Sequence, residues 1–156
     1  MTDARGKAQE PKNLRRKSRM AALQSLFAAD VRGEGAESSL DWLAEEDLLQ
    51  ATTVKFAACL VRGVTNSCAD LDGVIQRYAP AWPVAQLPLV DRNILRIALF
   101  ELIHTPNVPR KTAVNEAVEL AKVFGGDSSA RFINGVLGSV MAELDKEEIA
   151  SGNTRP

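Results

Sequence analysis

The sequence predicts an all-α protein, and three observations support that prediction. First, 46% of the 156 residues are hydrophobic but only 5% are aromatic, so the core is expected to be aliphatic and alanine-rich, which favours helices. Second, apolar residues recur along most of the chain at spacings of three and four, the repeat of a helix with one buried face. Third, no stretch alternates apolar and polar residues as a half-buried strand does. We expect six or seven helices around one central apolar helix.

The first helix is expected to begin at Asn13 and to end before Gly33, because apolar residues between them follow the helical repeat. Residues 1–11 are polar and lack that repeat, so they are expected to form a disordered basic arm. A short amphipathic helix is predicted next, over residues 40–49. The arm is expected to precede a single helical domain that spans residues 12–144.

The middle of the chain carries a long helical pattern over residues 52–78. Gly63 and Asn66 weaken its centre, so one kinked helix and two separate helices are both compatible with the pattern. Residues 79–88 contain three prolines and are predicted to be a connector with at most one short turn of helix.

Residues 89–104 form the most apolar segment, in which ten of 16 residues are apolar. These residues cover nearly the whole circumference of a helix, so this helix is expected to be buried on several sides. The following helix is predicted to run from Pro109, which suits a first turn, to Phe124, where two glycines stop it. The helix over residues 89–104 is therefore the predicted centre of the fold.

The last helix is predicted to start after Asp127 and Ser128, whose side-chain oxygens suit a helix cap. Gly135 and Gly138 lie inside this helix, where glycine is unfavourable, and close packing against another helix is the expected reason. Residues 145–156 are charged and are expected to form a polar tail that frays from the domain.

The net charge of −1 hides a strong asymmetry along the chain. Residues 1–19 carry seven cations and two acids, while residues 20–156 carry 12 cations and 18 acids. A basic segment on an acidic body favours a polyanionic partner, although a solvated tail that only keeps the protein in solution is the alternative. Four cations also fall in the first turns of the predicted first helix, where the helix dipole disfavours positive charge and a bound anion is favoured: Arg15, Arg16, Lys17 and Arg19.

Several functional classes are excluded by what the sequence lacks. No apolar run is long enough to cross a bilayer, and no signal peptide is recognisable, so a cytoplasmic protein is expected. Cys59 and Cys68 have neither the spacing of a metal site nor the density of a disulfide scaffold. The only histidine, His104, is expected on the surface, and no nucleotide-binding or nucleophile motif is present. We expect a binding protein without catalytic residues, metal or cofactor.

Three runs carry a family resemblance: VDRNILRIALFEL over residues 90–102, NEAVELAK over residues 115–122, and FINGVL over residues 132–137. In this order and spacing they resemble the bacterial NusB transcription antitermination family, and the likeness covers about residues 14–142. The resemblance implies an all-helical fold of two packed three-helix subdomains. The fold implied by the resemblance is consistent with the helical pattern described above.

The resemblance also implies a function. Members of the family bind the boxA segment of nascent RNA, typically in ribosomal RNA leaders, together with the small-subunit ribosomal protein NusE. They associate with transcribing RNA polymerase and other Nus factors, and a homodimer of the free protein is compatible with the resemblance. The alternative from a different class is a helical protein–protein scaffold that does not bind RNA.

The family pattern places RNA contacts at the start of the first helix and near the loop before the last helix. In this chain the corresponding residues are Arg15, Arg16, Lys17, Arg19, Phe27, Lys122, Asp127 and Ser128. Asp91 is the candidate contact to NusE, although its carboxylate also suits a helix N-terminus. Asp127 likewise has two explanations, an RNA contact or a simple helix cap.

Overall fold

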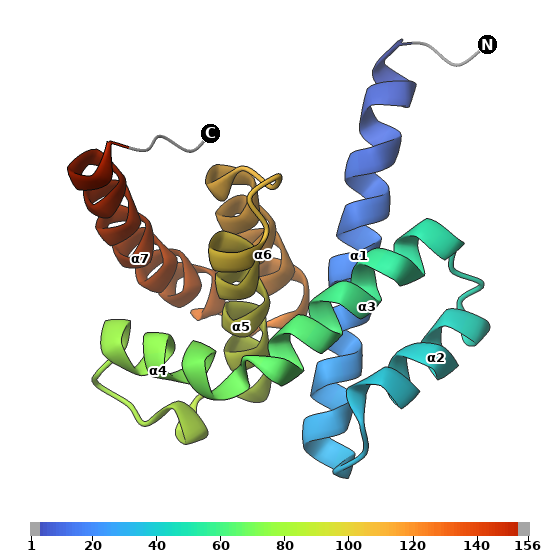
Figure 1. Ribbon diagram of the computed structural model, residues 1–156. Helices are drawn as coiled ribbons and strands as arrows, with labels where there is room; N and C mark the ends of the chain where they lie inside the picture. Colours follow the sequence, from blue (N-terminus) through green and yellow to red (C-terminus); the bar gives the residue numbers. More distant parts are fainter. Residues whose placement is uncertain (1–3, 153–156) are drawn as a thin grey trace. The chain divides into compact units, whose positions relative to one another are not determined.

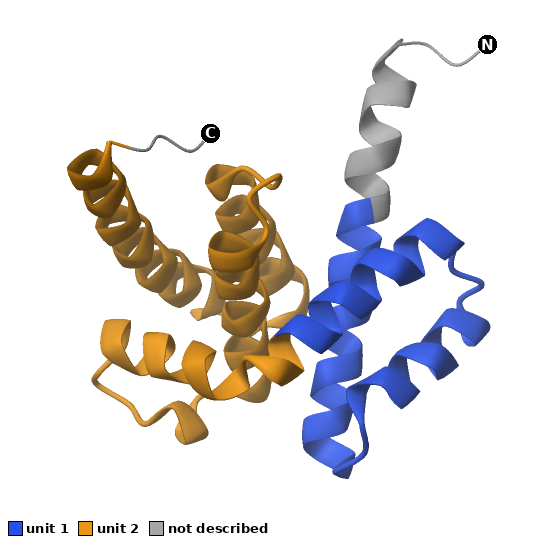
Figure 2. Cartoon of the chain, in the orientation of Figure 1, with its two compact units in different colours: residues 1–63 blue, residues 64–156 orange. Residues whose placement is uncertain are grey.

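The computed structural model describes the backbone of residues 4–152 and the side chains of residues 15–152. Within these residues the chain forms seven α-helices and one short 3-10 helix, without any strand (Figure 1). The prediction of an all-α fold is therefore confirmed. The chain divides into two compact units, residues 1–63 and residues 64–156, which are coloured separately in Figure 2.

The first unit contains helices α1 (Ala4–Arg32), α2 (Ala36–Glu46) and most of α3 (Ala51–Asn66). A three-residue loop reverses the chain between α1 and α2, and the two helices pack side by side (Figure 1). Gly33 makes this reversal possible because its φ of 71° lies in the left-handed region that closes a helix. The core of the first unit is aliphatic and includes Ala22, Leu23, Leu26, Leu40, Ala57 and Leu60.

The start of α1 corrects the sequence prediction. The helix begins at Ala4 and not at Asn13, so residues 4–11, expected to be disordered, are helical, while residues 1–3 lie outside the described residues. The prediction relied on an apolar repeat, which these residues lack. Ala4, Lys7 and Ala8 have high intrinsic helix propensity, but Gly6 and Pro11 disfavour a helix interior, so propensity does not explain the extension.

The following elements largely match the sequence pattern. Helix α2 begins four residues before the predicted segment, and the long pattern divides at Ser67 into α3 and α4 (Cys68–Tyr78), the second of the two alternatives. The proline-rich connector contains a single turn, the 3-10 helix η1 (Val84–Gln86). Prolines on both sides of this turn leave no room for a longer helix.

The second unit is built around α5 (Leu89–His104), whose bounds agree with the prediction. Helices α4, α6 (Arg110–Phe124) and α7 (Ser129–Ser151) all contact α5. Helix α5 is therefore buried on several sides, as its apolar residues around the whole circumference predicted. Its buried residues include Ile94, Leu95, Ala98, Leu99 and Leu102.

A polar network fixes α5 against α4 inside the second unit. The Arg96 Nε donates to Asp72 Oδ1 and its Nη2 donates to Asp72 Oδ2, both at 2.7 Å. Its Nη1 donates to Asn93 Oδ1 at 3.2 Å, and the Asn93 amide donates to the Leu89 carbonyl at 3.0 Å. A two-pronged guanidinium–carboxylate pair fixes both distance and orientation, so these residues of the 90–102 run hold the fold together.

The end of α7 is the second correction. The helix continues through Ser151 and closes at Gly152, so residues 145–151 are not a frayed tail, and residues 153–156 lie outside the described residues. The Arg110 guanidinium of α6 explains the difference, because its Nη2 lies 2.6 Å from Glu148 Oε1 and its Nη1 lies 3.5 Å from Asp145 Oδ1. Arg110 is buried, so these ion pairs hold the last turns of α7 against the unit.

Gly135 and Gly138 also differ from expectation. Both are exposed, and a β-carbon added at either would meet nothing within 4 Å. Close packing against another helix therefore does not explain these two glycines, and nothing in the structure explains their presence in α7.

Candidate nucleic-acid and partner interfaces

The cationic cluster of Arg15, Arg16, Lys17 and Arg19 lies within α1, and the helix distributes its members over different faces. Successive residues turn by about 100°, so four neighbouring cations cannot all face the same way. Arg15 and Lys17 are exposed and Arg16 is half-buried, whereas Arg19 is only 3% exposed. The structure therefore divides a cluster that the sequence treats as one.

An aromatic ring on α3 orders one side of this cluster. The guanidinium carbons of Arg15 and Arg19 lie 5.5 Å and 5.7 Å from the ring centroid of Phe56. One turn away, the Ser18 hydroxyl donates to the Thr53 carbonyl at 2.8 Å. Cation–π attraction holds a guanidinium without occupying its in-plane N–H donors, so the exposed Arg15 can still meet an anion. Arg19 is buried, so it offers an outside ligand little accessible surface.

The electrostatic argument from the helix dipole is wrong for this chain. The dipole acts within the first and last turns of a helix, and α1 begins at Ala4, three turns before Arg15. The cations are therefore not opposed by the helix in which they lie. What supports an anion site is instead the exposure of Arg15 and Lys17 beside a ring that fixes the neighbouring guanidiniums.

Phe27 lies further along the same helix and is 39% exposed. Eleven residues separate it from Arg16, which corresponds to about three full turns, so both residues point from the same face of α1. An exposed aromatic ring on the face of a cation is suited to stacking against an unpaired base. An RNA contact by Phe27 stays a prediction.

The second group of predicted RNA contacts lies in the other unit, at the turn between α6 and α7. Lys122, Asp127 and Ser128 are all exposed, and the Lys122 Nζ lies 3.2 Å from Glu119 Oε1. Neither Asp127 nor Ser128 caps α7 as predicted, since Ser128 occupies the cap position without a side-chain hydrogen bond. These two side chains therefore do not cap α7, so of the two explanations offered for Asp127 the RNA contact stays as a prediction.

A different serine organises this turn. The Gly126 N–H donates to Ser129 Oγ at 3.0 Å, and Ser129 is buried. Position 125 has to be glycine, because a β-carbon on Gly125 would lie 2.5 Å from Ser129 Cβ and 2.8 Å from the Ala121 carbonyl oxygen. Close approach of the Ser129 side chain and the Ala121 carbonyl to Gly125 thus fixes the loop that presents Asp127 and Ser128.

Asp91, the candidate partner contact, lies in a pocket of the second unit with a volume of about 530 Å³. The side chain is in the first turn of α5 and is 6% exposed, and its Oδ1 accepts no hydrogen bond from the described residues. Apolar and aromatic groups surround it, together with one cation, in a lining that includes Trp82, Leu87, Pro88, Ser128, Arg131 and Phe132. A buried oxygen that accepts no hydrogen bond within the described residues is suited to accept one from a donor outside the chain.

Sequence reasoning missed four residues that these surfaces use. Phe56 and Phe132 were indistinguishable from core residues, and Trp82 stood among prolines without an apolar repeat. Arg131 lies next to the predicted cap residues and could have been noticed as a cation beside that loop. The 61% exposure of Trp82 is visible only in the folded protein.

Metal and membrane functions find no support among the described residues. No cluster of three or more metal-ligating side chains occurs between residues 15 and 152. No helix in the described part of the chain is long and apolar enough to cross a membrane. His104 is exposed, as expected, and its ring lies 5.2 Å from that of Phe100.

The fold and these surfaces define a class, the all-helical binding proteins that use helix faces and pockets for contact. Within that class, the model of the NusB family matches residues 16–142. A transcription antitermination protein NusB of Dehalococcoides mccartyi is 51% identical over 130 residues, which cover 83% of this chain and 91% of that protein. A NusB of Herpetosiphon aurantiacus is 41% identical over 139 residues, covering 87% and 95% of the two chains. The chain belongs to the NusB family.

Solved structures agree with this assignment. The T. maritima NusB has a TM-score of 0.78 and 32% identity, over 83% of this chain and 91% of that one. A complex of the antitermination factors NusB and NusE with double-stranded RNA matches with a TM-score of 0.75 and 25% identity, over 82% and 96% of the chains. The expectation of a binding protein that is not an enzyme is confirmed by the family.

Proposed function

We propose that this chain acts in transcription antitermination, by binding boxA-type RNA together with NusE and so modifying the processivity of RNA polymerase, in concert with other Nus factors. The observation that carries the RNA part is the pair of exposed cations on α1, Arg15 and Lys17, beside guanidiniums ordered by Phe56. Each phosphate that such a cation neutralises releases counterions, which drives binding. The family assignment supports the same function.

Base selection requires more than phosphate contacts. Phe27, exposed on the face of Arg16, offers a stacking surface for an unpaired base. Lys122, Asp127 and Ser128 offer one cation and two hydrogen-bonding groups in the second unit. We assign the α1 cations to phosphates, and Phe27 with the α6–α7 turn to the bases.

A gel shift or anisotropy titration tests this function directly. It compares a boxA RNA with a scrambled RNA of equal length, each as a single strand and as a duplex, with and without NusE. We expect the tightest binding for single-stranded boxA with NusE. Equal affinity for boxA and scrambled RNA in every arm would contradict sequence-selective binding.

We place NusE at the pocket that contains Asp91. Its lining joins exposed aromatic and apolar groups with a buried carboxylate oxygen that accepts no hydrogen bond from the described residues. A basic or hydrogen-bond-donating side chain of a protein partner would satisfy that oxygen, and apolar neighbours would exclude water from the contact.

Asp91→Asn tests this placement, because it removes the charge and keeps the shape. Affinity for NusE is expected to fall by about tenfold, while the free energy of unfolding changes by at most about 1 kcal/mol, because Oδ1 accepts no hydrogen bond from the described residues and the lost charge weakens only the interaction with the N-terminus of α5. Asp70→Asn, an exposed acid near the start of α4, is the matched control. Unchanged affinity of the Asp91 variant would remove this pocket from the interface.

The scaffold alternative predicts a different outcome from the same titrations. A helical scaffold would bind NusE and no RNA, and the oligomeric state of the free protein, monomer or homodimer, would be unaffected by boxA. Sedimentation of the protein alone and with RNA separates these cases.

A further inference from the structure

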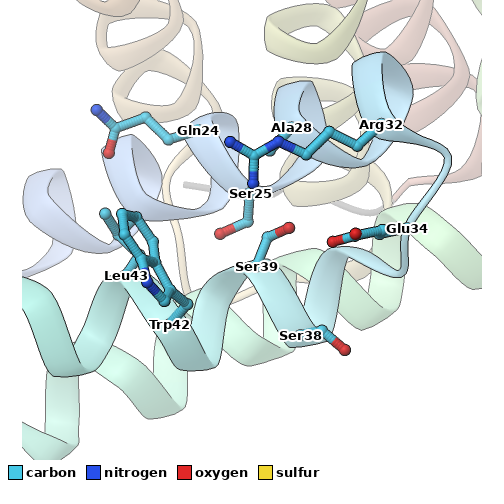
Figure 3. A pocket seen from close by; sticks show the side chains of 9 residues that line it. All are labelled: Gln24, Ser25, Ala28, Arg32, Glu34, Ser38, Ser39, Trp42 and Leu43. Atoms are coloured by element: carbon cyan, nitrogen blue, oxygen red, sulfur yellow. The ribbon is translucent and has the colours of Figure 1, made fainter.

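A cavity between α1 and α2, with a volume of about 400 Å³, takes no part in the surfaces described so far. Its polar and aromatic lining includes Gln24, Arg32, Glu34, Ser39 and Trp42. Figure 3 shows Arg32 extending from the end of α1 over the space that Ser39 and Trp42 border from α2. The cavity belongs entirely to the first unit.

Three side chains of this lining are not used by the fold. Among residues 15–152, the side chains of Gln24, Arg32 and Trp42 form no hydrogen bond, ion pair or ring contact. All three are exposed, and the exposed fraction of Trp42 is 62%. The Ser25 hydroxyl, by contrast, is buried and donates to the Ala21 carbonyl at 2.7 Å. An amide, a guanidinium and an aromatic ring are therefore available to a ligand at one place.

These groups match the parts of a nucleotide. The ring of Trp42 can stack against an unpaired base, and the Arg32 guanidinium can bind a phosphate through two parallel N–H donors. The Gln24 amide and the Glu34 carboxylate suit the edge of a base, because a carboxylate accepts a hydrogen bond from the exocyclic amine of cytosine. The one acid in the lining thus favours a base with an amino group, while the one arginine favours the phosphate.

The cavity is continuous with the basic cluster on α1. A smaller cavity of about 280 Å³ shares Gln24 and Leu43 with it and is also lined by Lys17 and Asp47, which form no ion pair with each other. Lys17, Gln24 and Arg32 lie within about 80° of one another around α1, so they belong to one face of that helix. Helix α1 has no acid between residues 15 and 29. A strand bound at Lys17 can therefore follow α1 to Arg32 without meeting a carboxylate of that helix.

Helix α2 is acidic, but none of its four acids lines either cavity. Asp41 and Glu45 lie about 160° and about 120° around α2 from Ser39, which borders the larger cavity. Glu37 forms an ion pair with Arg62 at 2.8 Å. The acidic side of α2 therefore faces away from the cavity, and phosphates held on α1 would lie on the opposite side of the bases from it.

We propose that this cavity holds one nucleotide of the RNA strand that flanks boxA, with its base stacked on Trp42 and its phosphate at Arg32. The inference rests on the proposed RNA binding and extends the RNA path beyond boxA. From Lys17 to Arg32 the path along α1 measures about 22 Å. At a rise of about 3.4 Å per stacked nucleotide, that distance corresponds to roughly six nucleotides.

RNAs of different length test this path in the absence of NusE. Minimal boxA is compared with boxA extended by about six cytidines at the 5′ or the 3′ end, and with the same extensions built from abasic nucleotides, which keep the phosphates and lack the bases. We expect the cytidine extension at one end to raise affinity about tenfold, and its abasic counterpart to raise it less than about threefold. In Trp82→Phe, Trp42 is the only tryptophan, and its emission should change with that extended RNA and not with minimal boxA.

Two variants link the gain in affinity to the cavity. Trp42→Ala should abolish most of the roughly tenfold gain and leave the affinity for minimal boxA unchanged. Arg32→Ala should reduce the gain and flatten the slope of log affinity against log salt by about 0.7, on the extended RNA alone. Arg62→Ala is the matched control, because Arg62 is an exposed arginine of the same unit that Glu37 already neutralises. It should keep the full gain.

Several results would overturn the proposal. They are no gain from either extension, an equal gain from abasic nucleotides, and a full gain in Trp42→Ala. Saturation of Trp42 emission by cytidine monophosphate, without a gain from extended RNA, would make the cavity a site for free nucleotides. A change of Trp42 emission caused by NusE alone, or by raising the protein concentration, would assign the cavity to a protein or to a second copy of this chain.

The same extensions on a scrambled RNA separate this proposal from the proposed function. Equal affinity for minimal boxA and minimal scrambled RNA, with the extension gain present in both, would contradict sequence-selective binding and leave the nucleotide in the cavity. Selective binding of minimal boxA without any extension gain would do the reverse.

Discussion

Two pairs of arginines, one pair in each unit, are held in different ways. In the second unit, Arg96 and Arg110 are buried and meet carboxylates, at 2.7 Å from Asp72 and 2.6 Å from Glu148. In the first unit, Arg15 and Arg19 instead lie over the ring of Phe56. A carboxylate neutralises an arginine, whereas a ring orients it without adding a negative charge. The ring of Phe56 therefore orients the exposed Arg15 without neutralising it, whereas carboxylates compensate Arg96 and Arg110 inside the second unit.

The largest effect is expected from Arg96→Met. The substitution keeps most of the side-chain volume but leaves the partly buried Asp72 without its cation, which costs about 3 kcal/mol of unfolding free energy. Urea unfolding followed by circular dichroism measures the loss. Arg62→Met is the matched control, because both members of its ion pair with Glu37 are exposed and such pairs contribute at most about 1 kcal/mol. Equal losses in the two variants would remove the distinction between structural and surface arginines.

Glu148→Gln should have the next largest effect. It removes the nearer carboxylate from Arg110, whose side chain is largely buried, and the expected cost is about 2 kcal/mol. Its neighbour Glu147 is exposed, so Glu147→Gln serves as the control. Thermal unfolding of both variants measures the difference, and a silent Glu148→Gln would mean that the end of α7 contributes nothing to stability.

Arg15→Ala with Arg16→Ala tests the charge on α1. If both side chains meet phosphates, affinity at 0.1 M salt falls on the order of tenfold for boxA and scrambled RNA alike, and the slope of log affinity against log salt flattens by about 0.7 per lost contact. Lys111→Ala with Lys146→Ala removes the same charge from exposed positions elsewhere. Loss confined to boxA would instead assign these arginines to base contacts, and an unchanged salt slope would exclude them from the RNA surface.

Phe56→Leu should have the smallest effect. The leucine retains an apolar group below Arg15 and Arg19 but removes the cation–π attraction, which is worth about 0.5–1 kcal/mol, so RNA affinity falls by roughly two- to fivefold. Phe100→Leu, another half-buried phenylalanine, controls for general loss of aromatic packing. A full-affinity Phe56 variant, measured by anisotropy on boxA RNA, would show that the ring does not order the cations.

The bounds of a helix were predictable where a proline or glycine marked its end in addition to the apolar repeat. Helix α5 has the expected bounds because Pro88 and Pro106 flank it, and Gly125 ends α6 as expected. The two misjudged ends lacked such signals. Helix α1 starts early across residues that carry no apolar repeat, and α7 ends late because Arg110 reaches a carboxylate 38 positions away in the sequence.

The candidate sites were predictable as residue types and not as surfaces. Sequence spacing grouped Arg19 with Arg15, but its burial depends on Phe56, which lies 37 positions further along the chain. The Asp91 pocket likewise joins Trp82 with Phe132, fifty positions apart. Local pattern contains no information on such long-range neighbours.

The surroundings of Gly125 limit which substitutions this position tolerates. The backbone there is extended, with a φ of −92°, which any residue adopts, so the restriction comes from the Ser129 side chain and the Ala121 carbonyl that a β-carbon would strike. Gly126, Gly135 and Gly138 face open space instead. In a library of random substitutions selected for folded protein, position 125 should stay glycine while the other three positions accept alanine and larger residues. Replacing Ser129 by a smaller residue would remove only part of this clash, because the Ala121 carbonyl oxygen would still lie 2.8 Å from the added β-carbon.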